Sequence, residues 1–274
     1  MNNKLKFAAF IIFTLILTAC GTAATPTLVP IIIPGNTVVP GQGQQAPTVV
    51  VPTQAANAAV SGGCANTYFP VPSGANWAYS STGGALGAFT YTWTVAAVSD
   101  TGFTTDIQSS LGANSTVKWN CQDGNLAALD GGSGSLSITT SKVTVTSDSI
   151  TADGYNIPAS FDTGNTWSEK VTTDSTVKSG TKTEQSQLVS QLDCTAAGTD
   201  TVTVPSGTFE TVKVTCNETI AVSALVQGTA IPAGNPVAET ITDWYAKGVG
   251  LVKSVKTVTS TGSSETIVLT QYKV

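Results

Sequence analysis

Four cysteines, Cys64, Cys121, Cys194 and Cys216, are the residues whose type and spacing most directly suggest chemistry. Thiolates either bind a metal or pair as disulfides. No two of these cysteines have a Cys-x-x-Cys spacing, and the chain has no histidine, so the set does not suit zinc. An even number of cysteines is typical of disulfides in an exported chain. We therefore predict two disulfides and no metal site.

The pairing follows from a turn signal at Pro205–Gly207. Cys194 lies twelve residues before the centre of this turn and Cys216 ten residues after it. In a hairpin with one bulge the two cysteines face each other, at a separation that a disulfide can close. Cys64 and Cys121 then pair by elimination. The loop-entropy relation gives about 3 and about 4 kcal/mol of stabilisation for the two bonds.

Two Asp-Thr-Gly triplets, which begin at Asp100 and Asp162, suggest acid–base chemistry. The second resembles the catalytic loop of pepsin-like proteases, in which two aspartates share one proton. The triplets lie too close together in the sequence for such a two-lobed enzyme, and Asp followed by Gly is a turn signal throughout this chain. We expect each aspartate to cap a turn by accepting a hydrogen bond from a backbone N–H one or two residues on. No catalytic residue is predicted.

Seven aromatic residues are candidates for lining a ligand site. A strand-rich domain needs aromatic side chains to fill its core. Several of them together also suit a pocket on a concave sheet or a platform on which a sugar stacks. The candidates are Trp77, Tyr79, Trp93, Trp119, Trp167, Trp244 and Tyr245.

The N-terminus has the pattern of an export signal. Two lysines precede an apolar run, Phe7–Leu17, that is too short to span a bilayer, which needs about 20 apolar residues. The following string, Leu17–Cys20, resembles the lipobox of bacterial lipoproteins. The resemblance implies a signal peptide at 1–19, cleavage before Cys20, and diacylglyceryl and palmitate-type chains on that cysteine. Two or more acyl chains anchor a protein stably, so we expect an extracytoplasmic protein on the cell membrane, or on the outer membrane if the cell has one.

The segment 20–63 is predicted to be a tether that begins at the lipidated cysteine. It holds six prolines and no charged residue, and prolines at this density disfavour helices and central strands. An extended chain of this composition acts as a spacer between the membrane and a folded domain.

Residues 64–274 are predicted to form an all-β domain. Apolar and polar residues alternate in 142–146, 201–204 and 211–214, and turn signals recur at short intervals. We expect an antiparallel meander that forms a strongly curved sheet, a half-barrel or a barrel, with a β-sandwich as the alternative. Two Gly-x-x-Trp strings suggest a weak duplication, with halves at about 64–150 and 151–274.

Three strings carry a family resemblance. Tyr68–Trp77, Val202–Phe209 and Trp244–Lys253 resemble segments of uncharacterised bacterial envelope lipoproteins, in which a β domain begins with a Phe-Pro…Gly…Trp string and ends with a Trp-Tyr…Gly-Val-Gly-Leu hairpin. The resemblance implies a strongly curved antiparallel sheet, akin to the half-barrel of periplasmic lipoprotein carriers. It implies no catalytic residue.

The charge of the chain restricts its functions. Only 11% of residues are charged, none is arginine, and without its signal peptide the chain has ten lysines against 17 acids. Nucleic acid binding needs clustered cations and is not expected, nor is a cofactor. We expect a non-enzymatic, lipid-anchored envelope protein whose curved sheet binds an apolar or envelope ligand or a protein partner. The alternatives are a carbohydrate- or cell-wall-binding module that uses exposed aromatics and, third, a hydrolase.

Overall fold

The computed structural model describes residues 62–84, 86–129, 137–139 and 143–274, and this part of the chain is all-β, as predicted. The described residues all belong to one compact unit. The predicted signal peptide, lipidation site and most of the tether lie outside the described residues. No helix within the described ranges is long and apolar enough to cross a bilayer.

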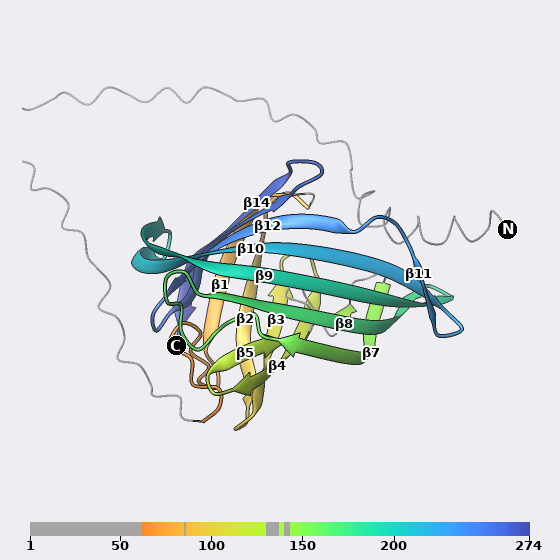
Figure 1. Ribbon diagram of the computed structural model, residues 1–274, viewed down its shortest axis with the longest axis horizontal. Helices are drawn as coiled ribbons and strands as arrows, with labels where there is room; N and C mark the ends of the chain where they lie inside the picture. Colours follow the sequence, from red (N-terminus) through yellow and green to blue (C-terminus); the bar gives the residue numbers. More distant parts are fainter. Residues whose placement is uncertain (1–61, 85, 130–136, 140–142) are drawn as a thin grey trace, which may run out of the picture. The chain divides into compact units, whose positions relative to one another are not determined.

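In the described part of the chain, fourteen strands form one sheet (Figure 1). They are β1 (Asn76–Gly83), β2 (Phe89–Val98), β3 (Gly102–Ser109), β4 (Asn114–Gln122), β5 (Asn125–Ala128), β6 (Ser137–Thr139), β7 (Val143–Gly154), β8 (Thr166–Ser179), β9 (Lys182–Val204), β10 (Gly207–Val226), β11 (Thr229–Pro232), β12 (Val237–Ala246), β13 (Gly250–Val258) and β14 (Ser264–Lys273).

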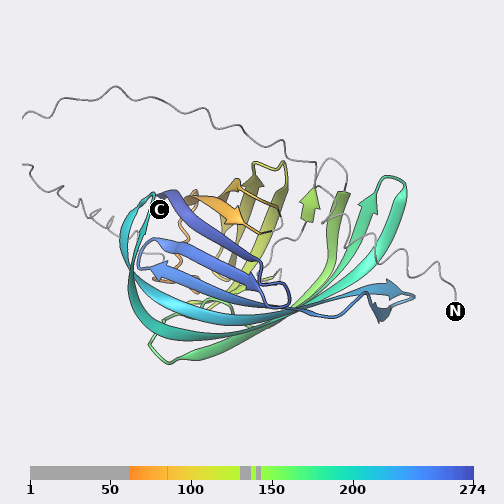
Figure 2. The ribbon, with the colours of Figure 1, turned by 90° about the horizontal axis from the view of Figure 1, so that it is seen from above.

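The sheet is an antiparallel meander that nearly closes into a barrel, so the sandwich alternative is excluded. Twelve strands follow one another in a ring, because β14 pairs with β1 and β10 pairs with both β9 and β12; β5 and β11 attach beside β4 and β10. Figure 2 shows the blue C-terminal strands curling round beside the orange first strand. Among the described residues, β4 and β6 are joined by one residue pair, Asn114 and Thr139.

The β9–β10 hairpin is the longest unit of the sheet, with strands of 23 and 20 residues. Its turn falls at Pro205–Ser206, where Val204 pairs with Gly207. Val alternates with Thr or Lys on both strands near this turn, in 201–204 and 211–215, which suits a sheet with one buried face. A register shift beside Val214 bends the hairpin and brings Cys194 directly opposite Cys216.

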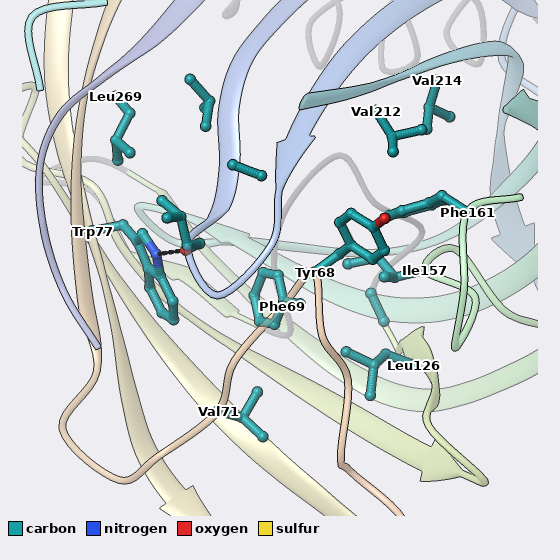
Figure 3. Packing of buried hydrophobic residues seen from close by; sticks show 14 of the residues in the cluster. Tyr68, Phe69, Val71, Trp77, Leu126, Ile157, Phe161, Val212, Val214 and Leu269 are labelled. Carbon is teal, nitrogen blue, oxygen red and sulfur yellow. Dashed lines mark hydrogen bonds between the residues drawn. The ribbon is translucent and has the colours of Figure 1, made fainter. Parts of the chain in front are cut away.

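One end of the ring is closed by the segment that precedes β1. Phe69 lies in the centre of this end, 2% exposed, with its ring centroid 5.2–6.0 Å from those of Trp77, Phe103 and Trp119. Figure 3 shows Phe69 and the fully buried Val71 among the aromatic and aliphatic side chains of this core. Closure by a loop explains how a barrel can have a packed core without covering helices.

The polar groups of this closed end are paired. Asn66 is buried, and its amide donates to the carbonyls of Gly124 and Pro158 at 2.8 Å while its carbonyl accepts from the N–H groups of Tyr68 and Phe69. Satisfied polar groups of this kind fix the position of a loop without the cost of burying an unpaired donor or acceptor.

Candidate functional site

Beyond the packed core, the inner face of the barrel carries a charge cluster. Cross-strand partners and alternate residues of a strand share a face. Glu218 follows buried Cys216 by two residues on β10, and Glu239 of β12 is its cross-strand partner. Lys256 of β13 lies opposite Ile241 of β12, which in turn lies opposite Cys216. The sequence therefore places these charged side chains on the face that buries the core.

Lys256 joins two carboxylates of this cluster. Its Nζ lies 3.6 Å from Glu218 Oε2 and 3.1 Å from Glu239 Oε2. The Ser190 hydroxyl of β9 donates to Glu218 Oε1 at 2.9 Å. The Glu218 side chain is only 2% exposed and that of Glu239 11%, whereas Lys256 is 25% exposed. The cluster is thus buried at Glu218 and reaches solvent at Lys256.

Asp243 is the third carboxylate and the least well paired. It lies opposite buried Val214 and Ser254. Burial raises its pKa to about 6, although hydrogen bonds from Ser254 and Tyr245 and the charge of Lys256 lower it. Tyr245 donates to Oδ2 at 3.3 Å, while Oδ1 is buried and accepts no hydrogen bond from the described residues.

The pKa values of Glu218 and Lys256 are both raised, for different reasons. Burial raises the pKa of Glu218, because its charged form loses hydration, and Lys256 and Ser190 only partly offset this. Burial lowers the pKa of Lys256, but the charges of Glu218 and Glu239 outweigh it and leave that pKa above its usual value. Lys256 therefore stays protonated.

A fourth carboxyl group and several half-buried apolar side chains surround the cluster. Glu265 of β14 lies opposite Lys256 and accepts a 2.5 Å hydrogen bond from Ser81. The apolar neighbours on the inner face pack against the core without being covered by it; they are Tyr91, Ile107, Ile241 and Ile267. The inner face is therefore apolar and acidic at the same place.

The seven predicted aromatic residues do not form one surface. Trp77, Tyr79, Trp119 and Trp167 are buried in the core, and none of the seven is fully exposed. Trp93 and Tyr245 are half-buried on the inner face, since they lie opposite Trp77 and Val212. Trp244 points to the outer face, where Lys253 and Lys213 lie 4.8 and 5.9 Å from its ring and it donates to Asp200.

The four cysteines form the two expected pairs. Cys64 is bonded to Cys121 and Cys194 to Cys216, with Cα atoms 4.9 and 4.0 Å apart. The first bond ties the segment before β1 to β4. The second crosses the β9–β10 hairpin on the inner face, two residue pairs before Glu218. The disulfides thus stabilise both the closed end and the strands that carry the charge cluster.

Asp100 and Asp162, which begin the Asp-Thr-Gly triplets, are exposed in turns. The predicted cap at Asp162 is wrong in detail: its carboxylate accepts from the Ser160 hydroxyl at 2.9 Å, and a backbone bond from Asn165 N–H to the Asp162 carbonyl closes the turn. Neither aspartate has the burial that a shared-proton dyad needs.

Sequence reasoning did not identify the charge cluster. Charged residues in strands usually face solvent, and Glu218, Glu239 and Asp243 were not among the candidate site residues. The available signal was alternation: Val214, Cys216 and Glu218 share one face of β10, and Ile241 lies between Glu239 and Asp243 on one face of β12.

A separate cleft of about 720 Å³ lies where β4 and β5 face β7. Asn120, Gln122, Asp153 and Tyr155 contribute to its lining, so it is not the apolar pocket expected from the sequence. Within the described ranges, no three His, Cys, Asp or Glu side chains are grouped to hold a metal ion.

One family model matches this chain. The family model described as DUF3108-like matches residues 92–257, more than half of the chain. No curated protein matches the chain.

Three solved structures are similar. A "putative exported protein with YmcC-like fold" from Bacteroides fragilis is 13% identical, with 76% of this chain and 100% of that chain covered and a TM-score of 0.48. A "putative lipoprotein" from Parabacteroides distasonis is 18% identical, with 76% and 99% covered and a TM-score of 0.49. The "hypothetical lipoprotein YmcC" from Escherichia coli is 10% identical, with 72% and 84% covered and a TM-score of 0.35.

Proposed function

The chain belongs to the DUF3108-like family, and we propose that it is a non-enzymatic, lipid-anchored protein of the cell envelope that binds an apolar ligand on the inner face of its sheet. The observation that carries this proposal is the set of half-buried apolar side chains, Tyr91, Ile107, Ile241 and Ile267, beyond the packed core. Partly exposed apolar surface on a concave face is what apolar ligands cover.

The alternative functions have less support. A carbohydrate platform needs exposed aromatic rings, and none of the seven candidate aromatics is exposed. A hydrolase needs two carboxyl groups free to act on a substrate. Glu218 and Glu239 instead share Lys256, and Asp100 and Asp162 lie exposed in turns.

The anchor is tested by labelling cells with a fatty-acid analogue. The wild-type chain should take up the label and fractionate with membranes, because acyl chains on Cys20 bury many methylene groups in lipid. The Cys20→Ser variant should take up none. Label that persists on this variant would show that Cys20 is not the lipidated residue.

The ligand is tested by photo-crosslinking in cells. We place p-benzoylphenylalanine at Ile241, on the inner face, and separately at the adjacent Thr242, which faces outward on the same strand. Mass spectrometry of the purified full chain should show an apolar small-molecule adduct at position 241 and not at position 242. Equal adducts at both positions, or none at position 241, would contradict ligand binding on the inner face.

A further inference from the structure

The polar cleft beside β4, β5 and β7 has the size of a small-molecule site. Its volume is about 720 Å³, and such sites typically have about 300–1,000 Å³. Small residues, Ala127, Ala152 and Gly154, line it together with larger polar side chains. The lining shares no residue with the charge cluster or with the half-buried apolar side chains of the inner face. The cleft is therefore a candidate for a second site, with a ligand of different chemistry.

The walls of the cleft are held by links between distant segments. Cys121 of β4 lines the cleft and is bonded to Cys64. Leu126 of β5 forms a bridge with Ile157, which lies just after the end of β7. The β4–β5 hairpin is thus tied both to the segment before β1 and to the segment after β7. A preformed cleft of this kind needs little ordering when it binds a ligand.

The tip of the β4–β5 hairpin places three polar side chains at the cleft. Gln122 and Asn125 are cross-strand partners, so their Cβ atoms lie about 5 Å apart. Asp123 lies in the turn between them with a φ of 52°, and Gly124 completes the turn with a φ of 82°, the conformation of a tight hairpin turn. The three polar residues all line the cleft, so one small ligand can contact them together.

Asn125 offers the cleft donors rather than acceptors. Its Oδ1 accepts a hydrogen bond from the Ala159 N–H at 2.9 Å, so Nδ2, with two N–H groups, is the atom that remains for a ligand. Within the described part of the chain, neither this Nδ2 nor the side-chain amide of Gln122 has a hydrogen-bond partner. A ligand that pairs with Asn125 must therefore carry acceptors.

Asp123 and Asp153 offer the cleft acceptors. Both residues are exposed and line the cleft, and a carboxylate group has acceptors alone. Lys170, the cross-strand partner of Asp153, is outside the lining, and the described residues that line the cleft include no lysine. The ligand must therefore also carry donors, and the two carboxylates disfavour an anion.

A neutral sugar meets both requirements. Each of its hydroxyl groups both donates and accepts, so neighbouring hydroxyls can bind an amide and a carboxylate at once. An ammonium or metal ion has no acceptor for Asn125 Nδ2, and an alkyl chain has neither donor nor acceptor. Tyr155 is half-buried in the lining and adds one aromatic side chain, against which the C–H groups of a sugar ring can pack.

We propose that the cleft binds one neutral sugar unit, whose hydroxyls accept from Gln122 and Asn125 and donate to Asp123. Asp153 and Tyr155 contact the sugar from the β7 side of the cleft. Hydrogen bonds hold this sugar, not a platform of exposed aromatic rings. The inference goes beyond the proposed function and does not depend on it, because the two sites share no lining residue.

The test is saturation-transfer NMR on the full chain in phospholipid nanodiscs. The probes are the methyl glycosides of glucose, galactose and mannose, each paired with the methyl glycoside of its uronic acid, and EDTA in the buffer excludes binding through a metal ion. At least one neutral probe should bind, with a dissociation constant of about 1 mM, and its uronic acid should bind about tenfold less tightly. No saturation transfer to any neutral probe, or equal binding of the neutral and acidic members of the pair, would overturn the proposal.

Two variants locate the site. Gln122→Ala and Asp123→Asn should each weaken binding of the neutral probe about fivefold to tenfold, the loss expected of one hydrogen bond. Asn is tolerated at a turn position with positive φ, so Asp123→Asn keeps the turn. Asp193→Asn, at an exposed residue of β9 outside the cleft, is the matched control and should leave binding unchanged. Binding that is insensitive to both cleft variants, or that falls equally in the control, would overturn the assignment.

The sugar site and the apolar site can fail separately. Photo-crosslinking at Ile241 reports on the inner face, and it should be unchanged in Gln122→Ala and Asp123→Asn. If crosslinking at Ile241 is lost together with sugar binding, the two variants act through the fold and not through a contact with the sugar, and the assignment to the cleft is overturned.

Discussion

The closed end of the barrel and the charge cluster lie on the same face of the same sheet, yet they treat buried polar atoms differently. At the closed end, Asn66 makes four hydrogen bonds and Trp77 Nε1 donates to the Val249 carbonyl at 2.6 Å. In the cluster, Asp243 Oδ1 accepts no hydrogen bond from the described part of the chain, and burial raises the pKa of Glu218. The paired polar groups of the closed end stabilise the fold. The incompletely paired carboxyl groups of the charge cluster lower the free energy of unfolding, and destabilising groups of this kind are typical of binding sites.

The largest effect is expected at the closed end. Phe69→Ala removes a ring that packs against four other aromatic rings, and it should lower the free energy of unfolding by about 3–5 kcal/mol, measured by urea denaturation. Phe89→Ala is the matched control, because Phe89 is only half-buried on β2; it should cost about 1 kcal/mol. Similar losses for the two variants would remove the distinction between a packed end and an open end.

Removing the cation of the cluster should have the next largest effect. Lys256→Met leaves Glu218 and Glu239 without their shared partner and should cost about 2 kcal/mol, less than for a fully buried pair because Lys256 is 25% exposed. Lys253→Met, on the outer face, should cost a few tenths of a kcal/mol. Thermal or urea unfolding of both variants measures the difference, and equal losses would contradict the buried ion pair.

The pH dependence of stability isolates Asp243. Its pKa of about 6 in the folded protein lies above the usual 3.8, so the folded state binds this proton more tightly than the unfolded state. Stability should therefore rise by about 1 kcal/mol as the pH falls from about 8 to about 5 through this group. Asp243→Asn should remove that part of the slope. Urea denaturation of wild type and variant from about pH 5 to about pH 8 measures how the free energy of unfolding changes with pH. The same pH dependence in both proteins would show that Asp243 does not titrate near pH 6.

The smallest effect is expected outside both regions. Asp162→Asn keeps the backbone bond that closes its turn and loses little from the Ser160 contact at the surface. The free energy of unfolding should change by no more than a few tenths of a kcal/mol. A loss of more than about 1 kcal/mol would indicate that this turn, too, contributes to the packed end.

The strands and the covalent links were readable in the sequence, because each depends on local chemistry. Thr and Val alternation indicates β9 and β10, and the Pro205–Gly207 turn determines that Cys194 faces Cys216. The closure of the barrel end by Asn66 and Phe69 was not predicted, since it depends on contacts with residues far along the chain. The charge cluster was not predicted for a different reason: alternation shows which residues share a face of a strand, but charged residues in strands usually face solvent, so the pattern alone does not indicate that the face of Glu218 is buried.

The pairing of β1 with β14 has a consequence for how the protein folds. A hydrogen bond from Thr270 to the Ala78 carbonyl spans 192 residues, and the strands that it joins are the first and last of the sheet. Loop-closure entropy must be overcome before such a pair contributes, and topologies dominated by distant pairings fold slowly. Until β14 has been made and has emerged, β1 and β13 both present an unpaired edge, which is the kind of surface on which chains aggregate. We therefore expect the pairing of β14 with β1 and β13 to be the slowest step of folding, and the chain to be most prone to aggregation before that step.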